Sequence, residues 1–250
     1  MDVWVEGRVA VLMAASRGIG KGIAGALARE GARVAIASRS EDALEAAAAE
    51  VDGEMSVFQA DTGDLDRLRN LPGEIADAFG PVEMLVTNTG GPPFGGALDN
   101  PLEEWDAAFR SLVLAPRVLI AEVLPGMRER GWGRIVNVSS TSIREPLPGL
   151  ALSNANRMAA LGLFKTLADE VARDGITVNT VATGRFATDR LASSDGSLEP
   201  AEAAARQEVP VGRLGKPKEY GDLVAFLCSE RAAYLTGAVI PLDGGVLRSI

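Results

Sequence analysis

The stretch from Ala14 to Gly20 has the residue types of a turn that binds an anion. It follows an apolar run at 8–13 with the length of a buried strand, and it precedes residues 21–30, whose apolar positions repeat at helical spacing. Gly18 and Gly20 let the backbone turn tightly and approach a ligand closely. Because a helix N-terminus presents free N–H groups and a partial positive charge, the turn suits a pyrophosphate. The alternative is a tight strand–helix connection that binds nothing. The candidate contacts are Ala14, Ser16, Arg17, Gly18, Ile19 and Gly20.

Ser38 and Arg39 close the second apolar run, 32–38, and bear on the choice of nucleotide. Dinucleotide folds that prefer NAD carry an acidic residue at this place, where it bonds the ribose 2′-hydroxyl. This chain has a serine there with an arginine beside it, and Arg17 in the glycine turn adds a second cation. Because a cation suits a 2′-phosphate, the pattern predicts NADP(H) rather than NAD(H). The alternative is that Arg39 only points into solvent.

Polar and small residues also follow the third and fourth apolar runs, at 55–60 and 82–87. Asp61, next to Thr62, would accept a hydrogen bond from an adenine amine or, equally, cap the next turn. The fourth run leads into Asn88, Thr89 and Gly90, which permit the close approach of a ribose or form a simple strand exit. Ligands of parallel α/β sheets lie beyond the carboxyl ends of the strands, so we expect these residues in one site.

The composition excludes several other classes of function. The chain has 250 residues and no histidine, which removes the commonest general acid–base, the commonest metal ligand and any Ser-His-Asp triad, so we expect no metal. Its net charge of -9 argues against nucleic acid and anionic membranes as main partners. Cys228 is the only cysteine, which excludes an internal disulfide and fits a cytoplasmic protein. We expect no signal peptide at residues 1–6 and no membrane span.

Strand-like runs that alternate with helix-like stretches predict the architecture that positions these residues. Beyond the four runs above, we expect strands at 134–139, 177–182 and 238–242. Such alternation indicates βαβ units, a parallel sheet and right-handed crossovers. We therefore expect a single α/β domain over residues 1–250, with a doubly wound, Rossmann-like parallel sheet of about seven strands flanked by helices.

Prolines fall inside two of the predicted helices. The helix at 64–79 is expected to break near Leu71-Pro72-Gly73. Residues 102–130 are expected to form one long helix that contains Pro116. Since a proline has no N–H, it leaves unpaired the carbonyl four residues before it, which here is that of Leu112.

Nearly the whole chain resembles the short-chain dehydrogenases/reductases, because several stretches match motifs of that family and follow one another in the family's order. The spacing A-x-x-x-G-x-G from Ala14 resembles that family's G-x-x-x-G-x-G turn, with an alanine whose methyl group crowds the turn. The branch it resembles most is 3-oxoacyl-(acyl-carrier-protein) reductase. The resemblance implies an oxidoreductase acting on a small carbonyl or alcohol, a homotetramer built on the long helices, and a cofactor contact at Gly184. The other matching stretches are 87–90 (family N-N-A-G), 133–140 (the fifth strand and catalytic serine), 178–184 (V-N-x-V-x-P-G, with Thr183 for proline), 212–217, and 235–237 with 243–245.

This chain keeps one member of that family's catalytic set of Asn, Ser, Tyr and Lys. The serine aligns with Ser140, and Ser153 replaces the tyrosine. Arg157 replaces the lysine, which in the family lowers the tyrosine pKa and holds the ribose. Leu112 replaces the asparagine, whose main-chain carbonyl helps to hold a relay water. Our hypothesis is that Pro116 keeps that carbonyl available, and the alternative is a kink that improves helix packing.

The replacements weaken proton transfer. A serine hydroxyl is a much poorer proton donor or base than a phenol, and an arginine, with a pKa above about 12, is neither. The only tyrosines, Tyr220 and Tyr234, lie far downstream in the chain. Since general acid catalysis contributes about 10²–10⁴-fold, its loss would leave hydride transfer slow rather than abolish it. Ser140 and Ser153 would then bind a carbonyl oxygen, with a water carrying the proton and Arg157 holding the ribose or orienting the carbonyl. The alternative for both serines is ordinary packing.

The segment at about 184–217 corresponds to the substrate lid of the family and contains a predicted short helix at 199–207. The alternative is a solvated connection. Glu145, in the loop after Ser140, is a further polar candidate near the substrate. The leading hypothesis is an NADP(H)-dependent oxidoreductase with an atypical catalytic set. The alternatives are a homologue that binds a nucleotide or metabolite without hydride transfer, and a subunit whose assembly matters more than any ligand.

Overall fold

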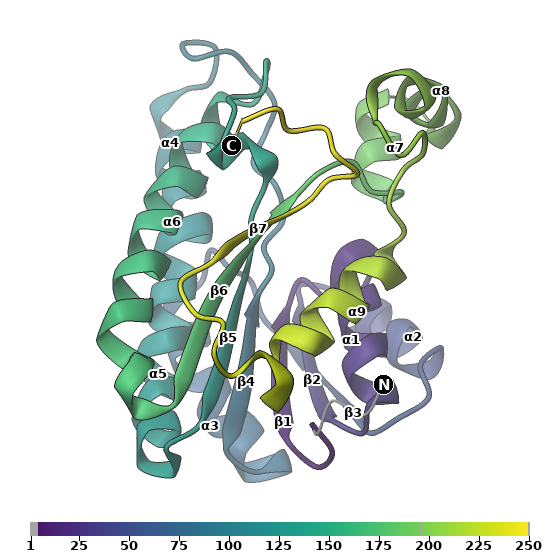
Figure 1. Cartoon of the computed structure of the whole chain (residues 1–250). Coiled ribbons are helices and arrows are strands. Elements are labelled where there is room, and N and C mark those ends of the chain that lie inside the picture. Colours follow the sequence, from purple (N-terminus) through teal and green to yellow (C-terminus); the bar gives the residue numbers. More distant parts are fainter. Residues whose placement is uncertain (1–4, 196, 250) are drawn as a thin grey trace.

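Seven parallel strands form one sheet in the order β3-β2-β1-β4-β5-β6-β7 in the computed structural model (Figure 1). The structure describes residues 5–195 and 197–249, apart from the side chains of 193–195. Residues 1–4, which belong to the segment where we expect no signal peptide, lie outside the described residues. So does Gly196, which belongs to the predicted lid. The strands are β1 (Val9–Met13), β2 (Arg33–Ser38), β3 (Met55–Gln59), β4 (Val82–Thr87), β5 (Gly133–Val138), β6 (Ile176–Thr183) and β7 (Val239–Leu242).

The apolar runs predicted these strands to within one residue at each end. Every residue of β1 is buried, as expected for a strand covered on both faces, whereas β3 is only partly buried at the sheet edge. The order reverses between β1 and β4, which are neighbours although β2 and β3 separate them in the chain. Such a switch point is where open α/β sheets bind their ligands.

Helices cover both faces of the sheet (Figure 1). One face packs against α1 (Gly18–Arg29), α2 (Glu41–Ala49) and α9 (Pro217–Leu227), and the other against α3 (Leu65–Phe79), α5 (Ala115–Arg130) and α6 (Ala151–Val171). The helices α1 and α9 approach each other closely through glycines, because a Cβ added at Gly221 would lie 2.2 Å from the carbonyl oxygen of Gly22. The glycine turn and its helix are therefore fixed between the sheet and α9.

The predicted break in the third helix is wrong. The helix α3 runs without interruption from Leu65 to Phe79, with Pro72 inside it. The proline removes one helical hydrogen bond, but Leu68 and Ile75 are fully buried against the sheet on either side of it. The packing of this apolar face outweighs the local preference for a break.

The predicted long helix at 102–130 contains a wide turn that the sequence did not indicate. It consists of α4 (Leu102–Phe109), a π-helical turn η1 (Arg110–Leu114), and α5. The Ala115 N–H donates to the carbonyl of Arg110, five residues back. The carbonyl of Ser111 therefore lacks its usual donor, and the next candidate, Pro116, has no N–H. That the Leu112 carbonyl is also available remains a prediction.

The segment between β6 and α9 carries two helices, which stand together beyond α1 and α9 (Figure 1). They are α7 (Asp189–Asp195) and α8 (Leu198–Glu208), of which α8 matches the helix predicted at 199–207. Buried side chains of α8 and of the chain after it form a small apolar cluster separate from the sheet. The segment is thus a compact unit of its own.

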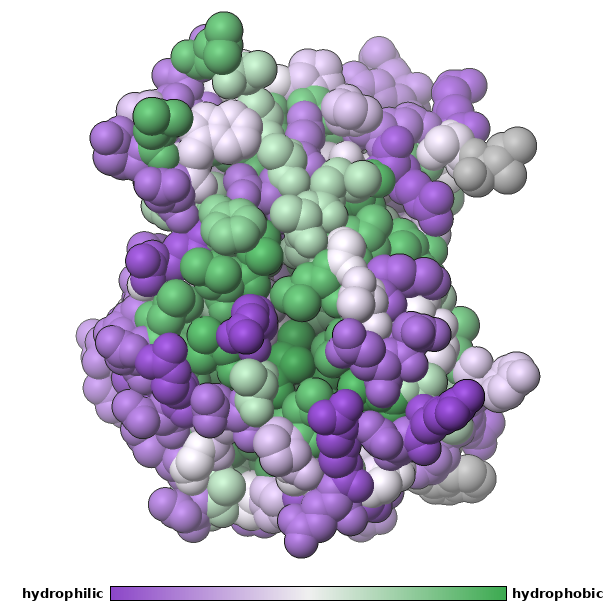
Figure 2. Space-filling model, turned by 90° about the vertical axis from the view of Figure 1, so that its left-hand side faces the viewer, coloured by the Kyte–Doolittle hydropathy of each residue, from purple (hydrophilic) through white to green (hydrophobic). Residues whose placement is uncertain are grey.

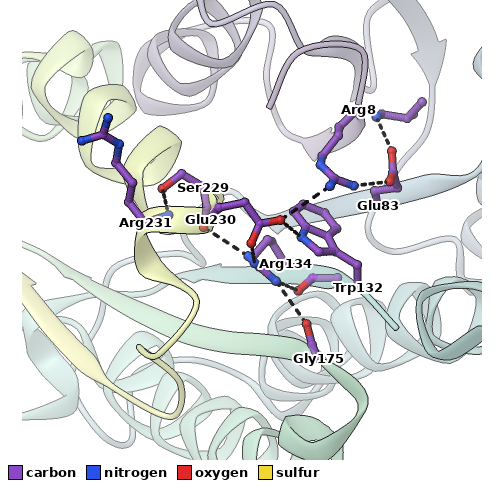
Figure 3. Close-up of polar contacts among 10 residues, drawn as sticks. Arg8, Glu83, Trp132, Arg134, Gly175, Ser229, Glu230 and Arg231 are labelled. Atoms are coloured by element: carbon purple, nitrogen blue, oxygen red, sulfur yellow. Dashed lines mark hydrogen bonds and ion pairs between the residues drawn. The ribbon is translucent and has the colours of Figure 1, made fainter. Parts of the chain in front are cut away.

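A cluster of aromatic and charged side chains joins the amino ends of the strands (Figure 3). The indole of Trp132 lies between two guanidinium groups, 3.6 Å from that of Arg8 and 4.3 Å from that of Arg134. Glu230, just after α9, accepts hydrogen bonds from the Trp132 indole N–H and from Arg134, and it also pairs with Arg8. The amino ends of β1 and β5 are thus tied to the turn that follows α9.

The side formed by α4, α5 and α6 shows a band of apolar surface across its middle, between polar regions (Figure 2). Exposed apolar side chains on these helices include Phe109 of α4 and Met158 of α6, with 43% and 49% of their surface accessible. No helix in the described part of the chain is long and apolar enough to cross a membrane.

Candidate nucleotide and substrate site

The glycine turn holds two residues in the left-handed backbone region. Gly18 has φ +54° and begins α1, three residues before the predicted start of the helix. Ala14 has φ +48° and is the only described residue other than glycine with positive φ. This conformation costs an alanine about 1–2 kcal/mol. A Cβ at Gly20 would lie 2.3 Å from the carbonyl oxygen of Ala14, so the turn needs glycine there for close packing.

The turns after β1 and β4 lie side by side at the switch point. The Asn88 side-chain amide donates to the carbonyl of Ala14 at 3.0 Å. The next residue, Ala15, donates its N–H to Ala37 at the end of β2, at 3.3 Å. The structure therefore brings together the turn predicted for pyrophosphate and the turn predicted for ribose. Thr89 and Gly90 continue this second turn directly after Asn88.

The residues predicted for the adenosine end are less closely gathered. Asp61 accepts a hydrogen bond from the Gly63 N–H at 2.8 Å, which is the capping role left open by the sequence, and Thr62 lies within that turn. The Ser38 hydroxyl donates to the carbonyl of Ser40 at 3.4 Å, and Arg39 is exposed. Arg17 points toward α7 instead, with 3.9 Å between its guanidinium and the Asp189 carboxylate. These side chains do not form a preassembled phosphate clamp.

Ser153 and Arg157 lie one turn apart on α6, and Arg157 connects this helix to the end of β5. Its Nε donates to the Ser153 hydroxyl at 3.1 Å, and its Nη1 donates to the carbonyl of Val138 at 3.0 Å. Two residues after Val138, the Ser140 hydroxyl accepts from the Ser142 N–H at 3.1 Å. Each serine oxygen therefore already accepts one hydrogen bond from the protein. Each hydroxyl proton remains available for donation to a ligand oxygen.

Arg157 keeps its positive charge although its surroundings disfavour a charged group. Burial, together with the nearby positive charge of Arg190, lowers the pKa of Arg157 to about 10, while Tyr220 opposes this shift. The guanidinium therefore remains protonated at neutral pH. It acts as a hydrogen-bond donor and a positive charge, and not as a proton acceptor.

Tyr220 lies close to the site in space but cannot replace the missing catalytic tyrosine. It is fully buried in α9, and its hydroxyl lies 3.0 Å from that of Thr183 at the end of β6. Burial raises its pKa above the ordinary value for a phenol, which makes it a poorer proton donor. Thr183 stands where the family pattern has proline, and its hydroxyl gives the buried phenol a partner. Next to it, the Gly184 N–H bonds the carbonyl of Leu242 at 3.0 Å.

The sequence did not indicate the role of Arg190 on α7. Its guanidinium donates to the carbonyls of Gly91 and Pro92, at 2.9 and 3.0 Å, and lies 5.0 Å from the ring centre of Phe94. The contact joins α7 to the loop after β4. No local motif marks such a residue, because its partners are main-chain carbonyls about a hundred positions away in the chain.

Glu145 has a partner of its own at the C-terminus. Its carboxylate accepts from the N–H groups of Arg248 and Ser249, at 3.1 and 2.7 Å. These bonds lower its pKa. The structure therefore shows Glu145 holding the C-terminal tail, a role that the sequence analysis did not predict.

A groove of about 430 Å³ lies between α1 and the start of α9, beside the glycine turn. Its lining includes Gly18, Lys21, Thr188 and Pro217, but none of Ser140, Ser153 and Arg157. It is therefore a recess beside the glycine turn, separate from the serines.

Comparison with known proteins agrees with this arrangement. Residues 13–247 match the family model described as enoyl-(acyl carrier protein) reductase. The chain is 36% identical to dehydrogenase/reductase SDR family member 4 of Bos taurus, over 97% of this chain and 88% of that protein. It is 35% identical to a 3-oxoacyl-(acyl-carrier-protein) reductase of Vibrio cholerae, over 97% and 98% of the two chains. The structure of L-sorbose reductase from Gluconobacter frateurii, complexed with NADPH and L-sorbose, superimposes with a TM-score of 0.92 at 30% identity over all of both chains.

Proposed function

The chain belongs to the short-chain dehydrogenase/reductase family of oxidoreductases, and we propose that it uses NADP(H) to reduce a small carbonyl compound or oxidise the corresponding alcohol. The proposal draws on the likeness to 3-oxoacyl-(acyl-carrier-protein) reductase, since the chain is 35% identical to such an enzyme of Vibrio cholerae. One observation carries the proposal: the Ser140 and Ser153 hydroxyls each accept a protein hydrogen bond and keep a proton for a substrate oxygen.

The glycine turn fits a dinucleotide in its shape. A Cβ at Gly20 would collide with the main chain, so this cradle depends on glycine, and the amides of Gly18, Ile19 and Gly20 form the first turn of α1. The residues proposed to hold the cofactor also include Asn88 and Gly184. When bound, the cofactor supplies the hydride. We expect the cofactor to bind more weakly to this chain than to homologues that have glycine at position 14.

The preference for NADP(H) over NAD(H) is supported by the residues after β2. Ser38 and Arg39 provide a hydroxyl and an exposed cation where an acid would favour NAD. L-sorbose reductase, at 30% identity, was crystallised with NADPH. Arg39 would move onto the 2′-phosphate from its exposed position. The buried single cysteine, Cys228, fits the cytoplasmic location that we also propose.

The chain's own groups would orient the carbonyl and offset charge on its oxygen. Ser140 and Ser153 donate hydrogen bonds to that oxygen, and Arg157 fixes Ser153 while adding positive charge. The proton comes from water, since no described phenol or ammonium group takes the place of the missing pair. Without a good general acid, turnover is expected to be lower by about 10²–10⁴-fold than with the tyrosine.

A second function is favoured by Tyr220. Since its hydroxyl is buried and bonded to Thr183, it cannot supply the lost acid, which supports a catalytically impaired homologue that binds a nucleotide or metabolite. In either case we propose a homo-oligomer, a tetramer by family resemblance. The apolar band on α4 to α6, with Met158 and Phe109 exposed, supports this assembly (Figure 2).

Nucleotide titration and turnover of a paired variant test the proposal. NADPH and NADH are titrated by nicotinamide fluorescence, and a carbonyl panel is assayed with the parent, with Ser153→Tyr/Arg157→Lys, and with the surface control Arg173→Lys. We expect slow turnover by the parent and a gain of about 10²–10⁴-fold in the double variant. Activity in the double variant with none in the parent would support the impaired homologue. A parent that binds neither nucleotide excludes both functions.

A further inference from the structure

Arg157 is an inward-facing cation whose protein partners are all neutral. It donates to a hydroxyl, that of Ser153, and to a main-chain carbonyl, that of Val138. None of the ion pairs among the described residues includes it. Charges taken out of water are normally paired, because the desolvation cost is otherwise uncompensated. The site thus carries a positive charge that no described carboxylate neutralises.

A second cation lies near the first. Arg190 is close enough for its charge to lower the pKa of Arg157, and its guanidinium is held on the carbonyls of Gly91 and Pro92. The two arginines come from opposite sides of the site, α6 and the lid. In a chain with a net charge of -9, this gathering of positive charge is local. It favours an anion at the place where the substrate would lie.

Arg157 also has N–H donors that make no hydrogen bond with a described residue. A guanidinium has five N–H groups, and its Nη2 makes no hydrogen bond with a described residue. The Nη2 atom has no hydrogen-bond partner, and it is not among the buried polar atoms that lack a partner in the described part of the chain, which are Asn100 Oδ1, Ser139 Oγ and Ser142 Oγ. It is therefore in contact with solvent. Arg157 as a whole is partly accessible. A ligand can therefore reach these donors.

We propose that Arg157 binds a carboxylate of the substrate, so that the substrate is an oxo acid or the corresponding hydroxy acid and not a neutral ketone or alcohol. This inference rests on the proposed function. Charge-assisted bonds from a guanidinium to a carboxylate are among the strongest polar contacts in proteins. Because Arg157 also bonds Ser153, the carbonyl and the carboxylate of one ligand must lie close together. That spacing fits a 2-oxo or 3-oxo acid.

Matched acids and esters test this inference by calorimetry. Pyruvate and acetoacetate, with methyl pyruvate and methyl acetoacetate as neutral counterparts, are titrated into the NADP⁺-saturated protein, where no reduction occurs. We expect the acids to bind at least about tenfold more tightly than the esters. Arg157→Gln removes that preference, Arg157→Lys retains part of it, and the exposed control Arg173→Gln leaves it unchanged. Circular dichroism and urea unfolding establish that each variant is folded.

Two outcomes would overturn the inference: equal binding of acid and ester to the parent, or an acid preference that survives in Arg157→Gln. Weaker NADP⁺ binding by Arg157→Gln with an unchanged acid preference would assign Arg157 to the cofactor instead. Failure of the proposed function is detected separately, as an absence of nucleotide binding by fluorescence. The same acid–ester comparison is then made on the nucleotide-free protein, where the Arg157 donors are present and the result still decides the inference.

Discussion

An arginine lies at each end of β5, and the two arginines differ in their partners. At the amino end, Arg134 lies in the cluster of Figure 3, where it bonds the carbonyls of Ser229 and Gly175 and pairs with Glu230 at 3.3 Å. At the carboxyl end, Arg157 has two neutral acceptors and no described carboxylate. Burial lowers both pKa values, but only for Arg134 does a carboxylate raise the pKa in opposition. We infer that the first arginine serves the fold and the second a ligand.

Hydroxyl groups at the two ends show the same contrast. Ser229, near the amino ends, is fully buried; its Oγ donates to the carbonyl of Phe226 at 2.6 Å and accepts from the Arg231 N–H. Ser139 and Ser142, on either side of Ser140, are buried with no partner for Oγ in the described structure. Buried polar groups are normally satisfied by protein or water, so unsatisfied ones mark a place that a water or ligand completes. The buried hydroxyl of Ser229 is thus hydrogen-bonded at the amino end of the sheet, whereas those of Ser139 and Ser142 at the carboxyl end are not.

The largest effect is expected from Arg134→Gln. The change removes one of the three partners of Glu230 and the donor to the carbonyls of Gly133 and Gly175, and we expect the loss of these bonds from a buried guanidinium to cost about 3 kcal/mol. Urea unfolding followed by circular dichroism measures the loss, with the exposed Arg173→Gln as control. A loss below about 1 kcal/mol, within the range of a surface pair, would contradict the structural role of the cluster.

Ala14→Gly tests whether strain is concentrated at the carboxyl end. Glycine removes the cost of positive φ at this position but adds chain entropy to the unfolded state, so we expect a net gain of up to about 1 kcal/mol. The control is Ala15→Gly, which lacks the positive φ and is expected to destabilise. The same unfolding assay measures both variants. A loss of stability in Ala14→Gly comparable to that in Ala15→Gly would show that position 14 is not strained.

The difference between the two ends also explains what the sequence could predict. The strands follow from apolar runs such as that of β1, because burial on both faces dictates their composition. The glycine turn follows from local backbone requirements. The sequence could not show that Pro72 lies inside an intact helix, since that depends on the packing of α3 against the sheet. Nor could it pair Arg190 with Gly91 or Arg157 with Val138, because these contacts join distant segments through main-chain carbonyls.

Arg157→Gln is expected to change the free energy of unfolding by less than about 1 kcal/mol, in contrast to the same substitution at position 134. The variant loses two hydrogen bonds to neutral acceptors, but it also removes a charge that no described carboxylate compensates. Urea unfolding of the two glutamine variants side by side gives the comparison directly. A loss at position 157 as large as that at position 134 would mean that both ends of β5 serve the fold.

The smallest effect concerns Glu145, the carboxylate at the carboxyl end that holds the C-terminal tail. The Ser249 and Arg248 N–H groups lower its pKa from 4.5, so its contribution is present above pH 4.5 and is lost as the pH falls through the lowered value. We expect the amide proton shifts of Arg248 and Ser249 to titrate together with a midpoint below 4.5. In Glu145→Gln this titration should vanish, while the exposed control Glu129→Gln retains it.

Because the tail contact is exposed, its loss should leave the global unfolding transition unchanged. A midpoint at or above the ordinary carboxyl value would show that the tail is not held by Glu145 in solution. A fall in global stability in Glu145→Gln would instead place part of the fold's stabilisation at the carboxyl end. That result would weaken the contrast between the compensated amino end and the ligand-directed carboxyl end of the sheet.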